Sequence, residues 1–271
     1  MKMTTTKSLL LLTLTLITLS GCGKTPPANE PVKMPPANEP VKTLPAEVTP
    51  APAAPVPTPV APVPASAVGQ MVPLELKLPR YRADGTPNPI EGEPNMEPAK
   101  PEDYRRPAFY VPKGTTNLAR GKDVTASEEP IVGELAQLVD SNAESTFENF
   151  LDLGFGPVWV TVDLGTQCEI FAILSWHRHN NQFAFRDVVI ETADDKDFAT
   201  NRQILFNNDH DGSLDKGHGK GAGKQYVETC EGKLIDAKGI KARYVRFWSN
   251  GSSYDNFTYW IEAQVFGREL K

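Results

Sequence analysis

Residues 158–164 read V-W-V-T-V-D-L, a stretch in which aliphatic side chains alternate with aromatic or polar ones. An extended backbone sends successive side chains to opposite faces, so one face of this segment carries Val158, Val160, Val162 and Leu164. Such alternation predicts a β-strand with one face in a core. Comparable runs occur at 170–176, 186–192, 226–229, 242–248 and 259–266, with Gly- and Asn-rich clusters between them. Since no long amphipathic helical pattern interrupts these runs, we predict an all-β antiparallel sandwich.

The first 21 residues predict a bacterial secretory signal. Lys2 and Lys7 form a short positive region, and residues 8–19 are apolar but too few to span a bilayer as a helix. They lead into L-S-G-C at 19–22, which resembles a lipobox, so Cys22 is predicted to be lipidated and to begin the mature protein. The alternative is an ordinary signal peptide with a coincidental cysteine. Gly23, in place of a retaining Asp, indicates an outer-membrane lipoprotein on the periplasmic or surface face, anchored by two or three acyl chains.

Proline dominates the segment that follows, residues 22–69. Of the 25 prolines only Pro130 and Pro157 lie after Lys113, and the nine-residue units PPANEPVKM and PPANEPVKT stand in tandem at 26–34 and 35–43. Because proline fixes φ and lacks an N–H donor, we predict a disordered, semi-rigid polyproline II tether on the order of 100 Å long, at about 3.1 Å per residue. A ligand for an aromatic-lined groove is the alternative.

Residues 70–113 keep many prolines but add leucines and aromatic residues. The segment is too short and too interrupted to bury a core of its own, so we expect an extended arm that packs along the following domain or stays apart from it.

The charge of the chain limits its partners. The formal charge is −6, and removal of residues 1–21, which hold Lys2 and Lys7 but no acidic residue, makes it −8. An acidic protein of this kind is not expected to bind nucleic acid or an acidic membrane surface, so the lipid anchor is the only predicted membrane contact. The sequence also contains no G-x-S-x-G, H-E-x-x-H or phosphate-binding loop, so we predict that the protein is not an enzyme.

Five segments of the last 155 or so residues follow one known domain in order. They are 117–127 (NLARGKDVTAS), 139–146 (VDSNAEST), 158–165 (VWVTVDLG), 242–247 (ARYVRF) and 261–267 (IEAQVFG). Together they resemble the discoidin or coagulation-factor type C domain, whose bacterial members are largely carbohydrate-binding modules. The resemblance implies a galactose-binding-like jelly roll over residues 114–271.

Bacterial modules of this family commonly hold a structural calcium ion, and the resemblance implies ligands at Asp140, Asn142, Thr146 and Glu262. Hard oxygen ligands of this kind suit Ca²⁺. Ser141 stands where the family usually has glycine. A plain surface turn is the alternative. A second acidic loop, residues 207–213 (NNDHDGS), begins like an EF-hand but has His218 instead of Glu at its twelfth position, which favours a solvated turn over a looser calcium loop.

Ligands of the resembled modules bind at loops on one end of the sandwich, where an aromatic ring covers the sugar and polar groups bond its hydroxyls. The predicted binding residues are Trp176, His177, His179 and Arg186 from one loop pair, and Asn250, Tyr254 and Phe257 from the loop at 249–257. Trp159, Trp248 and Trp260 fall within strand patterns and are predicted to be core residues, and Arg243 and Arg246 to be structural.

Cys168 and Cys230 are the two cysteines other than Cys22. Outside the cytoplasm two thiols more often pair than stay reduced, which favours a disulfide over two buried thiols.

Three hypotheses for function remain. The first is a noncatalytic carbohydrate-binding module displayed by a lipid anchor, with a glycan or polysaccharide as its partner. The second is a structural module of the cell envelope that binds another protein through the same loops. The third is a small jelly-roll metalloenzyme that uses His177, His179 and His210. An exposed aromatic platform beside polar groups would favour sugar, and a flat apolar patch would favour protein.

Overall fold

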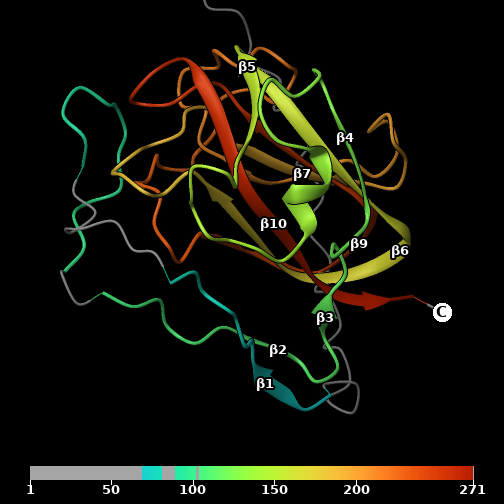
Figure 1. Cartoon of the computed structure of the whole chain (residues 1–271). Helices are drawn as coiled ribbons and strands as arrows, with labels where there is room; N and C mark the ends of the chain where they lie inside the picture. Colours follow the sequence, from blue (N-terminus) through green and yellow to red (C-terminus); the bar gives the residue numbers. More distant parts are fainter. Residues whose placement is uncertain (1–68, 81–88, 102–103, 271) are drawn as a thin grey trace, which may run out of the picture. The chain divides into compact units, whose positions relative to one another are not determined.

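The computed structural model describes residues 69–80, 89–101 and 104–270 (Figure 1). The signal peptide, Cys22 and nearly all of the tether at 22–69 lie outside these residues. In the described part, no helix has the length and apolar character needed to cross a membrane.

The regular secondary structure of the described chain is almost entirely β, and every pairing between its named strands is antiparallel. Its helical segment in this part is a single short 3-10 helix, η2 (Leu135–Val139). The strands are β1 (Met71–Pro73), β2 (Tyr110–Pro112), β3 (Thr116–Asn117), β4 (Asp123–Ala126), β5 (Leu151–Phe155), β6 (Val158–His177), β7 (Val189–Ala193), β8 (Gln203–Asn207), β9 (Lys233–Ser249) and β10 (Phe257–Glu269).

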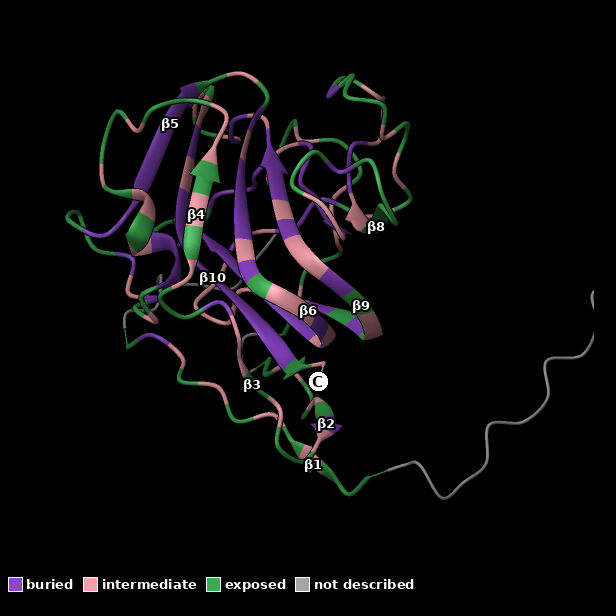
Figure 2. Cartoon of the chain, turned by 90° about the vertical axis from the view of Figure 1, so that its right-hand side faces the viewer, coloured by how far each residue is buried: buried purple, intermediate pink, exposed green. Residues whose placement is uncertain are grey.

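Two long strands, β6 and β9, build both layers of the sandwich. Their ladder shifts register between Asp163 and Cys168, and Gly165 there has φ +84°, a conformation that glycine adopts without steric cost. The first half of β6 pairs with β4 and with the end of β9, whereas its second half pairs with β10 and with the start of β9. Figure 2 shows the two strands curving over together, so that one continuous sheet folds into a jelly-roll sandwich.

The main core fills the space between the two layers. Val158, Val160, Val162 and Leu164 all belong to it, so the alternation that predicts the first strand is confirmed. Trp260 is also part of this core and is fully buried. The strand does not stop at Leu164, however, because the runs at 158–164 and 170–176 form one bent strand.

Each layer also has a second apolar face, and a segment without long strands covers each of them. On one layer, Val189 and Trp248 pack with Leu214 of the loop between β8 and β9, with Trp159 at their edge. On the other layer, Trp176 and its neighbours pack against side chains from the arm, namely Leu74, Leu76, Leu78 and Phe109. Burial on these outer faces therefore depends on loops and on the arm.

The arm is held to the domain by polar contacts as well. Its strands β1 and β2 pair with each other, and Lys113 N–H donates to Gln70 O at 2.8 Å. Arg106 donates to the carbonyls of Glu231 (2.8 Å) and Gly232 (3.1 Å). The arm is therefore a covering layer of the same compact unit.

Candidate functional site

Several loops meet at the end of the sandwich where β6 begins and β9 stops. Val158 pairs with Ser249 there, and Phe155 pairs with Phe257. The segments 178–188 and 249–257 also come together, because Arg186 N–H donates to Gly251 O and Asn250 N–H donates to Arg186 O. This is the end at which the sequence places the binding site.

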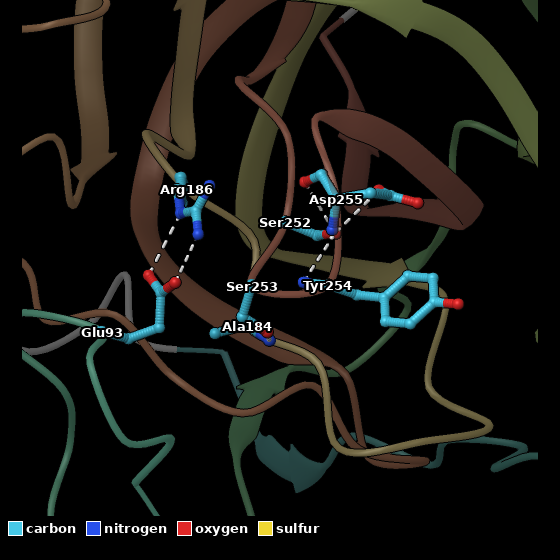
Figure 3. A network of polar contacts seen from close by, with 7 residues as sticks. All are labelled: Glu93, Ala184, Arg186, Ser252, Ser253, Tyr254 and Asp255. Carbon is cyan, nitrogen blue, oxygen red and sulfur yellow. Dashed lines mark hydrogen bonds and ion pairs between the residues drawn. The ribbon is translucent and has the colours of Figure 1, made fainter.

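Tyr254 sits at the tip of the second of these loops. The loop closes on Ser252, which donates its N–H to Asp255 O at 2.8 Å and accepts from the N–H of Tyr254 on its hydroxyl. The ring of Tyr254 is 75% exposed and points away from this network (Figure 3), with Phe183 as its aromatic neighbour at 5.4 Å. Among the predicted binding residues, Tyr254 is thus placed where a ligand can reach it.

Two other predicted binding residues are committed to internal partners. The guanidinium of Arg186 forms a bidentate ion pair with the carboxylate of Glu93 from the arm, to which both Nε and Nη2 donate (Figure 3). This carboxylate raises the pKa of Arg186 above its usual value. Asn250 donates its side-chain amide to Asp187 at 2.8 Å. In this arrangement both side chains hold the loop end together.

The prediction of a ligand contact at Trp176, His177 and His179 is wrong, because all three are fully buried. Trp176 donates its indole N–H to Cys230 O at 3.1 Å. Strand β6 runs on to residue 177, and the outer face that holds Trp176 lies under the arm. A period-two pattern shows which residues share a face but not whether a distant segment covers that face.

The two histidines have separate partners. His177 Nδ1 lies 3.0 Å from Glu228 Oε2, and its ring stacks between Phe185 and Trp260. His179 Nε2 lies 3.0 Å from Ala143 O, and burial lowers the pKa of His179. In the described residues the one group of three or more metal-ligating side chains is acidic and holds no histidine, so the geometry contradicts a metal centre made of His177, His179 and His210.

A row of five aromatic rings runs along β5 and the start of β10, and we call it the aromatic ridge. Successive ring centroids are 4.1 Å (Phe155 to Phe257), 6.1 Å (Phe257 to Tyr259), 5.7 Å (Tyr259 to Phe150) and 6.5 Å (Phe150 to Phe147) apart. Phe155 is 67% exposed and Phe147 82%, at the two ends of the row. Of these residues the sequence predicts only Phe257, although the alternation of Phe257 and Tyr259 was a readable signal.

Polar groups border the middle of the ridge. The guanidinium carbon of Arg178 lies 5.3 Å from the ring centroid of Phe150 and 5.6 Å from that of Tyr259. The Tyr259 hydroxyl donates to Asp255 Oδ2 at 2.8 Å. Burial, together with Asp255, raises the pKa of Tyr259, so the phenol stays protonated and keeps a donor at this position. Aromatic faces are therefore combined with a cation, a carboxylate and a hydroxyl.

The predicted calcium loop lies against the carboxylate of Glu262 on β10. Ser141 adopts φ +71°, the conformation for which glycine is favoured, and donates its N–H to Glu262 Oε1 at 3.1 Å. The other oxygen, Glu262 Oε2, is buried without a hydrogen-bond partner, and burial beside Asp140 raises the pKa of Glu262 to about 8. Asn142 and Thr146 are exposed on the same loop.

A second acidic group is formed by the loop at 207–213 together with Asp187. Carboxylate oxygens of Asp187, Asp209 and Asp211 lie within 4.8 Å of one another. The carboxylate oxygens of Asp209 already accept hydrogen bonds from the backbone, namely from the N–H groups of Gly212 and Leu214. These hydrogen bonds describe a structured turn, but Asp187 and Asp209 are buried, so the turn is not the solvated one that the sequence favours.

The predicted disulfide between Cys168 and Cys230 is wrong. Cys168 lies at the start of the second half of β6, opposite Glu269 of β10. Cys230 lies beyond the other end of that half, where its carbonyl meets Trp176. Eight residues of extended strand separate the two ends, roughly 26 Å at about 3.3 Å per residue, whereas a disulfide needs Cα atoms within about 7 Å. Cys168 is a buried small side chain of the core.

No protein-family model matches the chain, and no curated protein matches it in sequence. Among solved structures it is similar to a family 89 glycoside hydrolase from Clostridium perfringens, at 16% identity and a TM-score of 0.42, over 57% of this chain and only 15% of the hydrolase. A single module of that enzyme, solved with GlcNAc-α-1,4-galactose, matches at 14% identity and a TM-score of 0.42, over 58% of this chain and 96% of the module.

Two further similar structures are single modules. A chitosan-binding module from Paenibacillus sp. IK-5 shares 21% identity at a TM-score of 0.38, over 56% of this chain and 99% of the module. A fucose-binding module from Streptococcus pneumoniae shares 17% identity at a TM-score of 0.37, over 55% of this chain and 96% of the module. At such identities, what each protein binds is a property of that protein alone.

Proposed function

We propose that this chain is a noncatalytic glycan-binding protein, whose jelly-roll domain is displayed on a lipid-anchored tether at the cell envelope. The observation that supports it is the aromatic ridge: exposed rings with Arg178, Asp255 and the Tyr259 hydroxyl beside them. Aromatic rings cover the C–H faces of sugars, while planar polar groups bond hydroxyls in fixed directions. The ridge, with Tyr254 nearby, is the proposed ligand surface.

The test is a broad panel of immobilised glycans and polysaccharides probed with the purified full chain. Phe155→Ala and Phe147→Ala should each weaken retention about tenfold or more, since a ring that the ligand covers contributes on the order of 1.5–3 kcal/mol. Tyr110→Ala is the matched control, because Tyr110 is 56% exposed but lies on β2 of the arm, away from the ridge. Retention that survives both ridge variants would refute this location.

A protein partner is the second candidate function, and one observation favours it. Ile131 (62% exposed) and Val132 (41% exposed) border β5, where Ile131 Cδ1 lies above Gly154 beside Phe155. Together they widen the apolar surface beyond the rings. A folded protein that binds no glycan on the panel, but captures one envelope protein in a manner lost with Ile131→Asp, would support this function instead.

We further propose that the loop around Ser141 binds a structural calcium ion through Asp140 and Glu262, with Asn142 and Thr146 as the remaining side chains. The cation would give the unpartnered Glu262 oxygen a partner and order the loop, and it would supply no chemistry to a ligand. Calcium at 100 times its Kd should stabilise the fold by about 2.7 kcal/mol relative to EDTA. Calorimetry should show this shift for the wild type but not for Glu262→Gln.

A further inference from the structure

The most exposed rings of the aromatic ridge are its two end members. Phe155 lies at the end of β5, and Phe150 directly precedes that strand, with Phe147 three residues further back. Five residues of extended chain separate Phe155 from Phe150, roughly 17 Å at about 3.3 Å per residue. A single sugar ring is too short to touch both ends.

The rings between these ends are more buried, and they lie where polar groups gather. Phe150 is 8% exposed, and Phe257 and Tyr259 are half-buried. Arg178 stacks over Phe150 and Tyr259, and its Nε donates to Asn180 Oδ1 at 3.0 Å, which fixes the direction of the guanidinium. The middle of the ridge therefore presents hydrogen-bonding groups, while the two ends present apolar rings.

We infer that the ridge binds an extended, uncharged glycan chain that lies along β5 and β10 and contacts Phe155 and Phe147 at once. This inference rests on the proposed glycan-binding function and names its ligand class. A chain of sugars would place one residue against each end ring, with the hydroxyls of the sugars between them facing Arg178 and Asp255. A polyanion is disfavoured, because Asp255 and Asp152 border the ridge and the whole chain has a charge of −6.

Extended chains are typical of β-1,4-linked polymers, so the probes are the hexaoses of cellulose, chitin and mannan and the matching disaccharides. Binding to the full chain is measured by titration calorimetry for the wild type, Phe147→Ala, Phe155→Ala and the double variant. Both end rings are exposed, so neither single substitution should disturb the fold, and Tyr110→Ala again serves as the control.

We expect one of the hexaoses to bind, and each single substitution to lower the affinity for it roughly tenfold. The double variant should lower that affinity by the product of the two factors, since substitutions this far apart act independently. The disaccharide should bind more weakly and depend on one end ring at most. A disaccharide that binds as tightly as its hexaose, or a double variant no weaker than the worse single one, would overturn the extended-chain inference while leaving glycan binding intact.

Two negative outcomes are also informative. If the glycan panel finds a ligand but none of the three hexaoses binds, the ligand is not an extended β-1,4-linked chain and the inference is wrong. If neither the panel nor the hexaoses bind to folded protein, the proposed function fails together with it.

Discussion

Glu191 is a buried residue whose pKa is set by the polar side chains around it. Its carboxylate is 1% exposed and accepts hydrogen bonds from Arg202 Nε (2.6 Å) and Trp248 Nε1 (2.8 Å). His218 Nε2 lies 3.3 Å from Glu191 Oε2. Burial alone would raise the pKa of Glu191, but these three neighbours outweigh it and lower the pKa from 4.5 to about 2.

A pKa lowered by folding means that the native state favours the ionised carboxylate. The stability from Glu191 is therefore complete above about pH 4.5 and is lost as the pH falls toward 2, by an amount on the order of 3 kcal/mol. Urea unfolding at a series of pH values should show this loss in the wild type and a smaller one in Glu191→Gln, which starts less stable at pH 7. The exposed Glu129→Gln serves as the control, and an unchanged acid profile in Glu191→Gln would contradict the assignment.

Trp176 shows how a residue that suits a ligand can serve the fold instead. The indole of Trp176 is fully buried under the arm and donates a hydrogen bond to Cys230 O. Trp176→Ala should therefore cost about 3–5 kcal/mol of unfolding free energy. Tyr254→Ala should cost far less, because that ring is largely exposed. Chemical denaturation of the two variants distinguishes these roles, and equal stability in both would mean that Trp176 is not held as described.

At the scale of the element, regular alternation was predictable and irregular strands were not. The faces of 158–164 were predicted correctly, yet residues 226–229 form one isolated bridge, between Val227 and Ala184, where a strand was predicted. Strand β5 escaped prediction because Gly154, at φ +88°, interrupts its pattern, and Phe155, the ridge residue on that strand, escaped with it. A local sequence pattern does not predict a strand such as β5, whose formation depends mainly on pairing with its neighbour β10.

The arm is an element whose contribution can be measured. Leu76 and Leu78 pack on the outer face of one layer, whereas Met71 is 46% exposed. The double variant Leu76→Ala/Leu78→Ala should lose on the order of 1 kcal/mol of unfolding free energy per substituted residue. This is below the 2–5 kcal/mol that truncation of a fully buried leucine to alanine costs. Met71→Ala should be nearly neutral. Hydrogen exchange at the Leu74 and Lys113 amides should accelerate in the double variant, and unchanged protection there would show that the arm does not depend on these contacts.

At the scale of the whole molecule, the all-β class was predictable because core-facing residues repeat with period two over much of the domain. What covers each outer face was not predictable, since it depends on contacts between residues far apart in sequence, such as Leu76 with the sheet that holds Leu174. Long-range contacts also bury the three predicted ligand residues: the arm covers Trp176, Phe185 and Trp260 stack on His177, and His179 lies against Ala143. Exposed rings from different segments form the candidate surface instead.

The proposed anchor makes a prediction about the intact protein. Acylation at Cys22 should send the wild type into the detergent phase after phase separation, and mass spectrometry should find the lipid on that residue. Cys22→Ala should move to the aqueous phase, whereas Cys230→Ala should remain with the lipid. A Cys22→Ala protein that still partitions into detergent would show that another feature holds it to the membrane.

The antiparallel pairing of β1 with β2 has a mechanical consequence. Gln70 and Lys113 lie opposite each other, where the chain enters the arm and where it leaves for the domain. A force that pulls residue 69 away from a ligand-bound domain therefore loads the β1–β2 hydrogen bonds in the unzipping direction. They break one after another, beginning with the bond between Gln70 and Lys113, instead of being loaded together in shear. Peeling residues 70–113 away would release roughly 150 Å of chain at about 3.5 Å per residue before the load reaches the strands of the sandwich. Extension of the arm would thus limit the force that reaches the domain and its bound ligand under tension.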